Sequence, residues 1–353
     1  MAKRGPFRIA GETVKLGESK NIRIKFSESY LGSSVSIPVQ VMRAKKSGPT
    51  LLITGAIHGD ELTGVGIVRE LLYDKPPELI RGTLILIPVV NVYGLENHSR
   101  YLPDRRDLNR CFPGFAAGSP SSRLAYTLTE EVLSRADYVI DLHSAAVRRT
   151  NYPNVRADMR NPKVKEIAQA FGCELIVHGK GPQDSFRRTA VSRGVPAVIL
   201  EAGEVWKNEP GVVDYGVRGC LNVMRWLKMI AGEPEKPTFQ TTIKKTSWVR
   251  AERGGFLGFH VKPGDLVKEG EILSTNYSIF GRERHHLRSP GYGIILGMTT
   301  MPAVMPGEPV YHVANITRRT YSSIKRRLAE LGDDIYYQRV RDDLSTSVNI
   351  YER

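Results

Sequence analysis

The hydrophobic pattern of the chain predicts buried strands alternating with amphipathic helices. Continuous apolar runs without alternation, typical of strands covered on both faces, occur at residues 49–57, 82–90, 138–142 and 196–200. Shorter alternating segments at 21–26 and 36–42 are typical of half-buried strands. Helical spacing of apolar residues appears at 62–72, 122–134 and 161–171. Strands that alternate with helices indicate an α/β fold whose sheet is mixed, mostly parallel and flanked by helices.

The pattern changes near residues 232–237, where Gly, Pro and Glu dominate. From 238 to 315 the chain has short strands punctuated by Gly and Pro, which predicts a smaller all-β domain. Its segments 254–273 and 289–297 resemble the biotinyl/lipoyl-like barrel-sandwich fold. Carriers of that fold attach their cofactor to a lysine beside a methionine, and no Met-Lys pair lies between these segments. We therefore expect a structural module.

We predict three segments: an α/β domain at 1–237, the barrel-sandwich domain at 238–315 and a tail at 316–353. The tail has helical spacing at 321–331 and is otherwise polar, with no function assigned to it.

A polar residue directly follows each of the four continuous apolar runs. These residues are His58, Asn91, His143 and Glu201. In open α/β sheets the carboxyl ends of the strands carry the functional site. The sequence thus predicts that these side chains meet at one edge of the sheet.

Three of the residues in this region have the donor types of a metal site. His58 and Glu61 are three apart, and His143 follows another buried strand. Two histidines and one glutamate, with a fourth position open for water, form a known catalytic zinc set. Gly59 leaves room for a metal and a substrate beside the backbone. The alternative is that the histidines are only hydrogen-bonded, since a lone His-x-x-Glu often occurs by chance.

We expect one Zn²⁺ per chain, although cobalt or manganese could occupy the same ligands. Asp141, two residues before His143, is a candidate partner for that imidazole.

Four motifs occur in a fixed order: Gly-Ala-Ile-His-Gly-Asp-Glu at 55–61, Asp-Leu-Asn-Arg-Cys-Phe-Pro-Gly at 107–114, Asp-Leu-His-Ser at 141–144 and Leu-Glu-Ala-Gly at 200–203. Together they resemble the succinylglutamate desuccinylase/aspartoacylase family, a branch of the zinc carboxypeptidase-like hydrolases. The resemblance covers roughly residues 35–315 and includes the barrel module.

The resemblance implies roles for the matching residues. His58, Glu61 and His143 match the zinc ligands, and Glu201 matches the general base. A carboxylate beside an activated water can take its proton and pass it to the leaving amine. Arg100 matches the arginine that polarises the scissile carbonyl and stabilises the oxyanion.

The resemblance also implies residues that bind the substrate. Asn109 and Arg110 match a pair that grips a substrate carboxylate, which suits a guanidinium because it can donate two parallel bonds. Tyr101 adjoins Arg100 much as in the family. A second carboxylate-binding arginine is expected before the general base, where Arg187 and Arg188 both qualify.

Several assignments have alternatives. The interval from Arg100 to Asn109 is longer by two than in aspartoacylase, so Arg105 or Arg106 could take the role of Arg100. Glu204 is a rival general base. The Asn109-Arg110 pair could instead form a loop salt bridge, and segment 148–154 could line the pocket or be a plain basic loop.

Charge and composition narrow the choice of partners. The net charge is +14 and the pI about 9.7, which favours anionic substrates. The basic clusters are not interleaved with aromatic residues, which argues against a nucleic-acid partner. No apolar run reaches the length of about 20 residues that a membrane helix needs, and no apolar core follows the charged N-terminus. Three widely spaced cysteines predict no disulfide framework, and we expect a cytoplasmic protein.

The leading hypothesis is a zinc-dependent amidohydrolase that cleaves an N-acyl amino acid or a similar small anionic amide. The second is a metallocarboxypeptidase that removes acidic residues from peptide or protein tails. A third, from another class, is a non-catalytic zinc- or nucleic-acid-binding protein. The acyl group and the choice between monomer and homo-oligomer stay open.

Overall fold

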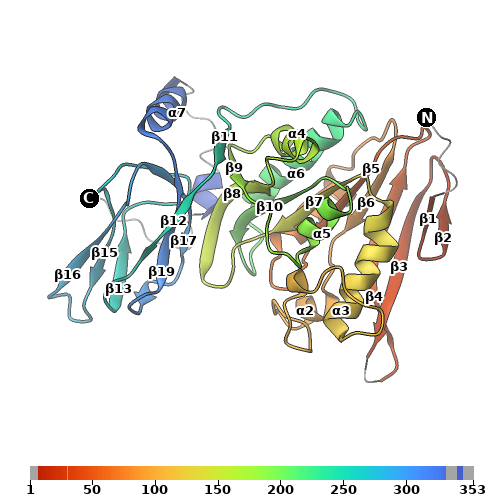
Figure 1. Cartoon of the computed structure of the whole chain (residues 1–353), viewed down its shortest axis with the longest axis horizontal. Helices are drawn as coiled ribbons and strands as arrows, with labels where there is room; N and C mark the ends of the chain where they lie inside the picture. Colours follow the sequence, from red (N-terminus) through yellow and green to blue (C-terminus); the bar gives the residue numbers. More distant parts are fainter. Residues whose placement is uncertain (1–6, 30, 331–339, 345–353) are drawn as a thin grey trace.

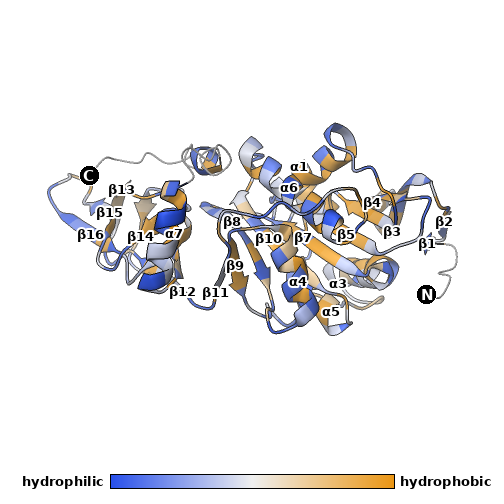
Figure 2. Cartoon of the chain, turned by 90° about the horizontal axis from the view of Figure 1, so that it is seen from above, coloured by the Kyte–Doolittle hydropathy of each residue, from blue (hydrophilic) through white to orange (hydrophobic). Residues whose placement is uncertain are grey.

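The computed structural model describes residues 7–29, 31–330 and 340–344. It shows a large α/β part with a smaller β-rich part at one end of an elongated molecule (Figures 1 and 2). The two parts share one 13-stranded sheet, whose main path runs β12-β19-β17-β8-β10-β7-β5-β6-β4-β3.

The strands of this sheet are β3 (Ser19–Glu28), β4 (Ser34–Arg43), β5 (Thr50–Gly55), β6 (Thr83–Ile87), β7 (Tyr138–His143), β8 (Arg149–Ala157), β9 (Leu175–His178), β10 (Ala197–Glu204), β11 (Thr241–Ile243), β12 (Thr246–Arg250), β14 (Leu266–Val267), β17 (Gly293–Thr299) and β19 (Pro309–Asn315). A separate hairpin joins β1 (Phe7–Ile9) to β2 (Glu12–Val14).

The four central strands are parallel and are joined on each side by an antiparallel strand, while β9 pairs in parallel with β8 and β11. Strands β10, β7, β5 and β6 pair in parallel, whereas β4 joins β6, and β8 joins β10, in antiparallel register. The four parallel strands are the four predicted apolar runs. The α/β fold with a mixed sheet is therefore confirmed.

Each central strand contributes to two hydrophobic cores, which explains why its sequence is apolar throughout. In β5, Leu51 and Ile53 lie in the core on one face, and Leu52 lies in the core on the other. Because successive side chains point to opposite faces, both faces must be covered by helices.

The helices are α1 (Thr63–Arg69), α2 (Val92–Glu96), α3 (Pro120–Thr127), α4 (Pro162–Phe171), α5 (Phe186–Ser192), α6 (Pro210–Trp226) and α7 (Arg318–Glu330). The three predicted helices in the α/β part are present as α1, α3 and α4, the first two extended by π-helical turns at Glu70–Asp74 and Leu128–Val132. Helix α6 was not predicted. It packs against α4 closely enough that a Cβ atom at Gly219 would lie 2.1 Å from the Phe171 ring.

The C-terminal part consists of two sheets that enclose a separate core. One is the antiparallel sheet of β16 (Arg284–Arg288), β15 (Ile272–Tyr277), β13 (Gly255–Phe259) and β18 (Ala303–Val304). The other is the end of the large sheet, and residues such as Leu273, Val310 and Tyr311 fill the space between. The predicted all-β barrel-sandwich region is confirmed.

Strand β8 connects the two parts, since it pairs with β10 on one side and with β17 on the other. Strand β11 also pairs with β9 of the α/β part. The domain limits at 237 and 315 stay a prediction. The tail helix is present as α7, with Tyr321 and Ile324 buried, while residue 331, its predicted end, lies outside the described residues.

Two further expectations concern the whole chain. The three cysteines are free, as predicted. Within the described ranges, no helix is both long and apolar enough to cross a membrane.

One histidine of the C-terminal part makes the stability of the fold pH-dependent. Burial, followed by Arg156 and Arg149, lowers the pKa of His312 from its ordinary 6.5 to about 4. Between these values the unfolded chain binds a proton that the folded chain does not, so the free energy of unfolding falls as the pH drops through this window. We expect His312 to account for up to about 2 kcal/mol of the loss.

This expectation is tested by urea unfolding at pH 7 and pH 4.5 of wild type and His312→Phe, a variant that keeps an aromatic ring. The difference between the two proteins isolates His312 from the carboxylates. Equal losses of stability in both would contradict the assignment.

Candidate metal centre and active site

The loop between β5 and α1 brings His58 and Glu61 to the carboxyl edge of the sheet. Gly59 makes this loop possible, because a Cβ atom there would lie 1.9 Å from the backbone of Gly94. His143 is the last residue of β7, the neighbour of β5. The loop and the strand end therefore converge, as the sequence predicted.

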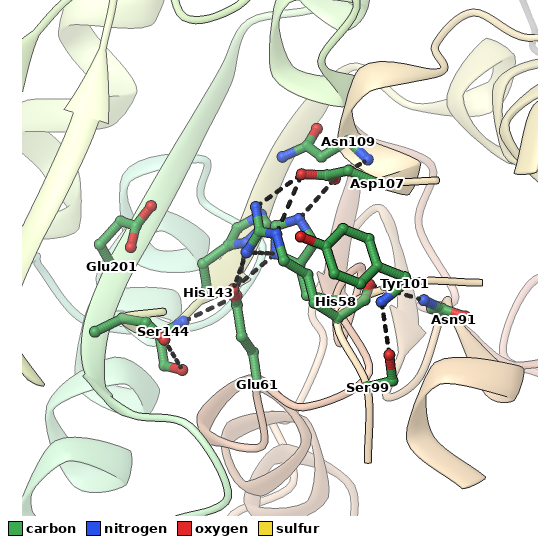
Figure 3. Close-up of polar contacts among 12 residues, drawn as sticks. His58, Glu61, Asn91, Ser99, Tyr101, Asp107, Asn109, His143, Ser144 and Glu201 are labelled. Carbon is green, nitrogen blue, oxygen red and sulfur yellow. Dashed lines mark hydrogen bonds and ion pairs between the residues drawn. The ribbon is translucent and has the colours of Figure 1, made fainter. Parts of the chain in front are cut away.

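The three predicted ligands form a compact, buried cluster (Figure 3). Their donor atoms lie within 4.8 Å of one another. The Nδ1 atom of His58 is 2.7 Å from one carboxylate oxygen of Glu61, and Nδ1 of His143 is 2.8 Å from the other. The side-chain donors thus face one point.

The second ring nitrogen of each histidine contacts a carboxylate. Nε2 of His143 lies 2.8 Å from Asp141, which also accepts a hydrogen bond from the Thr54 hydroxyl at 2.8 Å. Nε2 of His58 lies 3.0 Å from Asp107. Carboxylates in this position fix the orientation of histidines that bind metals. The contact of Asp141 was expected, and that of Asp107 was not.

The electrostatics of the cluster suit a cation. Burial acts to raise the pKa of Glu61, but His58 and His143 outweigh it and hold the pKa well below its usual range. Glu61 also accepts the backbone N–H of Ser144 at 3.1 Å. A buried, ionised carboxylate between two imidazole nitrogens is the donor set of catalytic zinc sites, so these residues fit a metal ion.

Arg100 lies beside this cluster. Its guanidinium donates to Asp107 at 2.9 and 3.2 Å and to Glu61 at 3.2 Å. Burial acts to lower the pKa of Arg100, but Glu61 and Asp107 raise it above its usual value. Arg105 and Arg106 are exposed. The geometry therefore favours Arg100 over both rivals.

Glu201 lies next to His143 on the neighbouring strand, with which it is in direct register. In Figure 3 it stands on the side of His143 away from Tyr101. Its carboxylate accepts a hydrogen bond from the Asn151 amide at 3.2 Å and lies 3.4 Å from the Arg156 guanidinium. The sequence predicted that Glu201 follows the end of its strand, and this is wrong. Glu201 lies inside β10, just before an irregularity in the pairing of β10 with β8.

Glu204, the rival base, is occupied elsewhere. Its carboxylate contacts the Thr300 hydroxyl and the Lys207 ammonium, both at 2.6 Å. The geometry favours Glu201 for a role beside the metal cluster.

Three of the predicted substrate-binding residues, Tyr101, Asn109 and Arg110, lie in the segment between α2 and α3. Asn109 is buried and accepts the backbone N–H of Phe186 at 2.9 Å. Arg110 is exposed and donates to the carbonyl of Asn109, with no carboxylate partner in the described part of the chain. Tyr101 is half exposed at the rim of the site. The structure brings Asn109 and Tyr101 near the cluster, while Arg110 points to solvent.

Arg187 and Arg188 differ in their surroundings. Arg187 is buried, and two of its guanidinium nitrogens have no hydrogen-bond partner. Burial, followed by Arg156, lowers the pKa of Arg187 to about 10. Arg188 is half-buried and donates to the carbonyl of Gly181 at 3.4 Å. The unsatisfied side chain is Arg187, which is the better candidate for an anion.

Two residues of this site, Asp107 and Arg156, were not predicted from the sequence, and a third, Asn151, belongs to segment 148–154, which was left open. Asp107 begins the Asp-Leu-Asn-Arg motif, so its carboxylate could have been considered. Asn151 and Arg156 both lie on β8, and only Arg156 falls outside the segment that had been left open as a pocket wall or a basic loop. Segment 149–157 is a strand, and its residues do line the site.

Comparisons with known proteins agree with this architecture. Residues 47–227 match the model of the succinylglutamate desuccinylase/aspartoacylase catalytic domain. The N-alpha-acetyl-L-2,4-diaminobutyric acid deacetylase of Halomonas elongata is 30% identical over 268 residues, which cover 72% of this chain and 78% of that protein.

Two solved structures extend the likeness to both parts of the molecule. A succinylglutamate desuccinylase/aspartoacylase from Rhodobacter sphaeroides superposes with a TM-score of 0.73 at 28% identity, covering 84% of this chain and 94% of that one. The product-bound ectoine utilization protein EutE (DoeB) from Ruegeria pomeroyi shares the fold, with a TM-score of 0.74 at 24% identity over 85% of this chain and 95% of that one. With these matches and a buried His-Glu-His cluster at the expected motifs, the chain belongs to the succinylglutamate desuccinylase/aspartoacylase family of deacylases.

Proposed function

We propose that this chain is a zinc-dependent amidohydrolase that removes the acyl group from an N-acyl amino acid. His58, Glu61 and His143 would hold one zinc ion, and Glu201 would act as the general base. The observation that carries the proposal is the register between β7 and β10, in which Glu201 is paired with the predicted ligand His143. The deacetylase activity of the Halomonas elongata relative supports the same reaction class.

The zinc ion, when bound, would supply a Lewis acid that polarises an amide carbonyl and acidifies water. The residues of this chain account for the rest. Glu201, oriented by Asn151 and Arg156, can accept a proton from water and deliver it to the leaving nitrogen. Arg100, anchored by Asp107, presents a cation where negative charge develops on the carbonyl oxygen.

The charges around the site support an anionic substrate. Arg187 is buried with unsatisfied donors, and burying an unpaired cation is costly unless an anion completes the site. The carboxylate of an amino acid would supply that anion. Asn109 and Tyr101 would contact the substrate on the same side of the site as Arg100.

The proposal is tested by measuring amine release from a panel of acetyl and succinyl amino acids. The panel should include N-alpha-acetyl-L-2,4-diaminobutyrate, N-acetylaspartate and N-succinylglutamate. We expect the zinc-loaded protein to hydrolyse at least one member, with activity lost on chelation and restored by added zinc. Stoichiometric zinc without any hydrolysis would refute the proposed activity, and no metal binding at all would refute the proposed centre.

A further inference from the structure

A tight turn after α2 sets the position of Arg100. The backbone N–H of Ser99 donates to the carbonyl of Gly94 at 2.8 Å, and the N–H of His98 donates to the carbonyl of Leu95 at 3.1 Å. With His98 in the left-handed region at φ 48°, these two bonds form the Schellman motif that ends many helices. Arg100 follows His98 by two residues, so the geometry of this turn determines where its side chain begins.

Trp206, two residues after the end of β10, is hydrogen-bonded to this turn. Its indole Nε1–H donates to the carbonyl of His98 at 3.2 Å, and its backbone N–H donates to the carbonyl of Asp60 at 2.9 Å. Asp60 belongs to the loop between β5 and α1 and directly precedes the predicted ligand Glu61. One residue therefore joins the turn that carries Arg100 to the loop that carries two of the predicted metal ligands.

The backbone of Trp206 is held in a conformation that bulky residues rarely adopt. Its φ is 58°, in the left-handed region where the Cβ atom crowds the following carbonyl. The residue is 53% exposed, so burial of the ring can offset only part of this strain. Strained residues persist where surrounding contacts hold them, and they cluster at functional sites. The hydrogen bonds to Asp60 and His98 are contacts of this kind.

The position of the turn matters because the Arg100 guanidinium has little freedom. It donates to Asp107 at 2.9 and 3.2 Å and to Glu61 at 3.2 Å. The Asn91 amide also donates to the backbone carbonyl of Arg100 at 3.4 Å (Figure 3). The carboxylates thus hold the end of the side chain, while the turn holds its beginning. A displacement of about 1 Å in such a group can lower a reaction rate about 100-fold.

We propose that Trp206 is a positioning residue for Arg100. Its indole hydrogen bond to His98 fixes the turn relative to the metal-ligand loop, so that the guanidinium lies where negative charge develops on the substrate carbonyl oxygen. The role of Arg100 in this proposal rests on the proposed function, whereas the effect of Trp206 on the turn does not. Trp206 acts through Arg100 and does not transfer a proton.

The first experiment compares the steady-state kinetics of zinc-loaded wild type and Trp206→Phe on the best N-acyl amino acid of the panel. Phenylalanine keeps an aromatic ring at this position but cannot donate to His98. We expect kcat to fall about fivefold, the effect of one lost hydrogen bond. KM should change less than about twofold, because Arg100 acts on charge that exists only in the transition state.

A double variant tests whether the effect passes through Arg100. In an Arg100→Gln background, Trp206→Phe should change kcat less than about twofold, because the group that it positions is already absent. The same fivefold loss in both backgrounds would overturn the proposal, since Trp206 would then act on something other than Arg100. Wild-type kcat in the single variant Trp206→Phe would also overturn it.

The second experiment separates positioning from stability. Trp206→Asn removes the indole and introduces a residue that tolerates left-handed backbone better than tryptophan does. We expect its melting temperature to stay or rise, while kcat falls at least about fivefold. The matched control is Lys228→Asn, which relieves a φ of 56° at an exposed turn after α6. Its melting temperature should also stay or rise, with kcat within about twofold of wild type. A lower melting temperature in Trp206→Asn would assign Trp206 a structural role only.

A third measurement does not depend on hydrolysis. Hydrogen exchange in zinc-loaded Trp206→Phe should be faster than in wild type at residues 95–101 and unchanged in β3, at the far edge of the sheet. Faster exchange without hydrolysis of any substrate would support the effect of Trp206 on the turn and refute the proposed function. Hydrolysis with unchanged exchange at 95–101 would keep the function and overturn the positioning role.

Discussion

Replacing Glu201 by glutamine is expected to lower kcat on the best N-acyl substrate by about 1,000-fold, within the range for loss of general acid-base catalysis. Glutamine keeps the shape of the side chain and can still contact Asn151, but it cannot accept a proton from water. The zinc content and the melting temperature should stay at the wild-type values, because Glu201 is not among the metal ligands. Steady-state kinetics with metal analysis measures both.

The matched control for this variant is Glu204→Gln. It lies on the same strand three residues later, and its carboxylate contacts Thr300 and Lys207 instead of the metal cluster. We expect it to keep kcat within about threefold of wild type, as for substitutions outside the site. A larger loss in Glu204→Gln than in Glu201→Gln would reverse the assignment of the base.

Replacing Glu61 by glutamine is expected to remove stoichiometric zinc and all measurable hydrolysis. Glu61 is the group that both imidazoles, the Ser144 amide and Arg100 contact. An amide cannot balance the charge of Arg100, and its NH₂ group would oppose one of the donors. Arg100 is partly exposed and keeps its pairing with Asp107, so the free energy of unfolding should fall by less than the about 3–5 kcal/mol of a fully buried pair.

Asp141→Asn is the control for Glu61→Gln and is expected to lose less zinc affinity. Asp141 holds His143 through Nε2 and does not face the point where the donors converge. Loss of the Asp141 carboxylate should weaken zinc binding by about 10–100-fold, the usual effect of removing a residue that hydrogen-bonds to a metal ligand. Metal analysis under competing chelator and urea unfolding rank the two variants. A stronger loss of zinc in Asp141→Asn than in Glu61→Gln would contradict the ligand assignment.

The sequence predicted the parts of this site that follow from local pattern. The apolar runs ending at Ile57 and Leu142 identify strands buried on both faces, and His58 and His143 were therefore expected at the edge of the sheet that carries the site. That their two strands are direct neighbours is a finding of the structure. Hydrophobicity and residue type therefore make these histidines candidate ligands. The family motifs then single out Glu61 as the third member.

What the sequence could not provide depends on contacts between distant segments. Strand β8 contains Arg149, Asn151, Pro153 and Arg156, which is an unusual composition for an interior strand and obscures its alternation. Its place in the sheet depends on pairing with both β10 and β17. Arg187 and Arg188 are adjacent in sequence, and only the tertiary packing shows which of them is buried.

The shared sheet also determines whether the α/β part can be produced without the C-terminal part. Strand β8 pairs with β17 along residues 149–151. A protein truncated after residue 237 lacks β17, so the backbone N–H and C=O groups of this stretch would be unpaired next to the proposed general base. Bare strand edges recruit other strands and promote aggregation. The C-terminal module thus acts as a protective cover for the catalytic part, which should be insoluble when it is expressed without it.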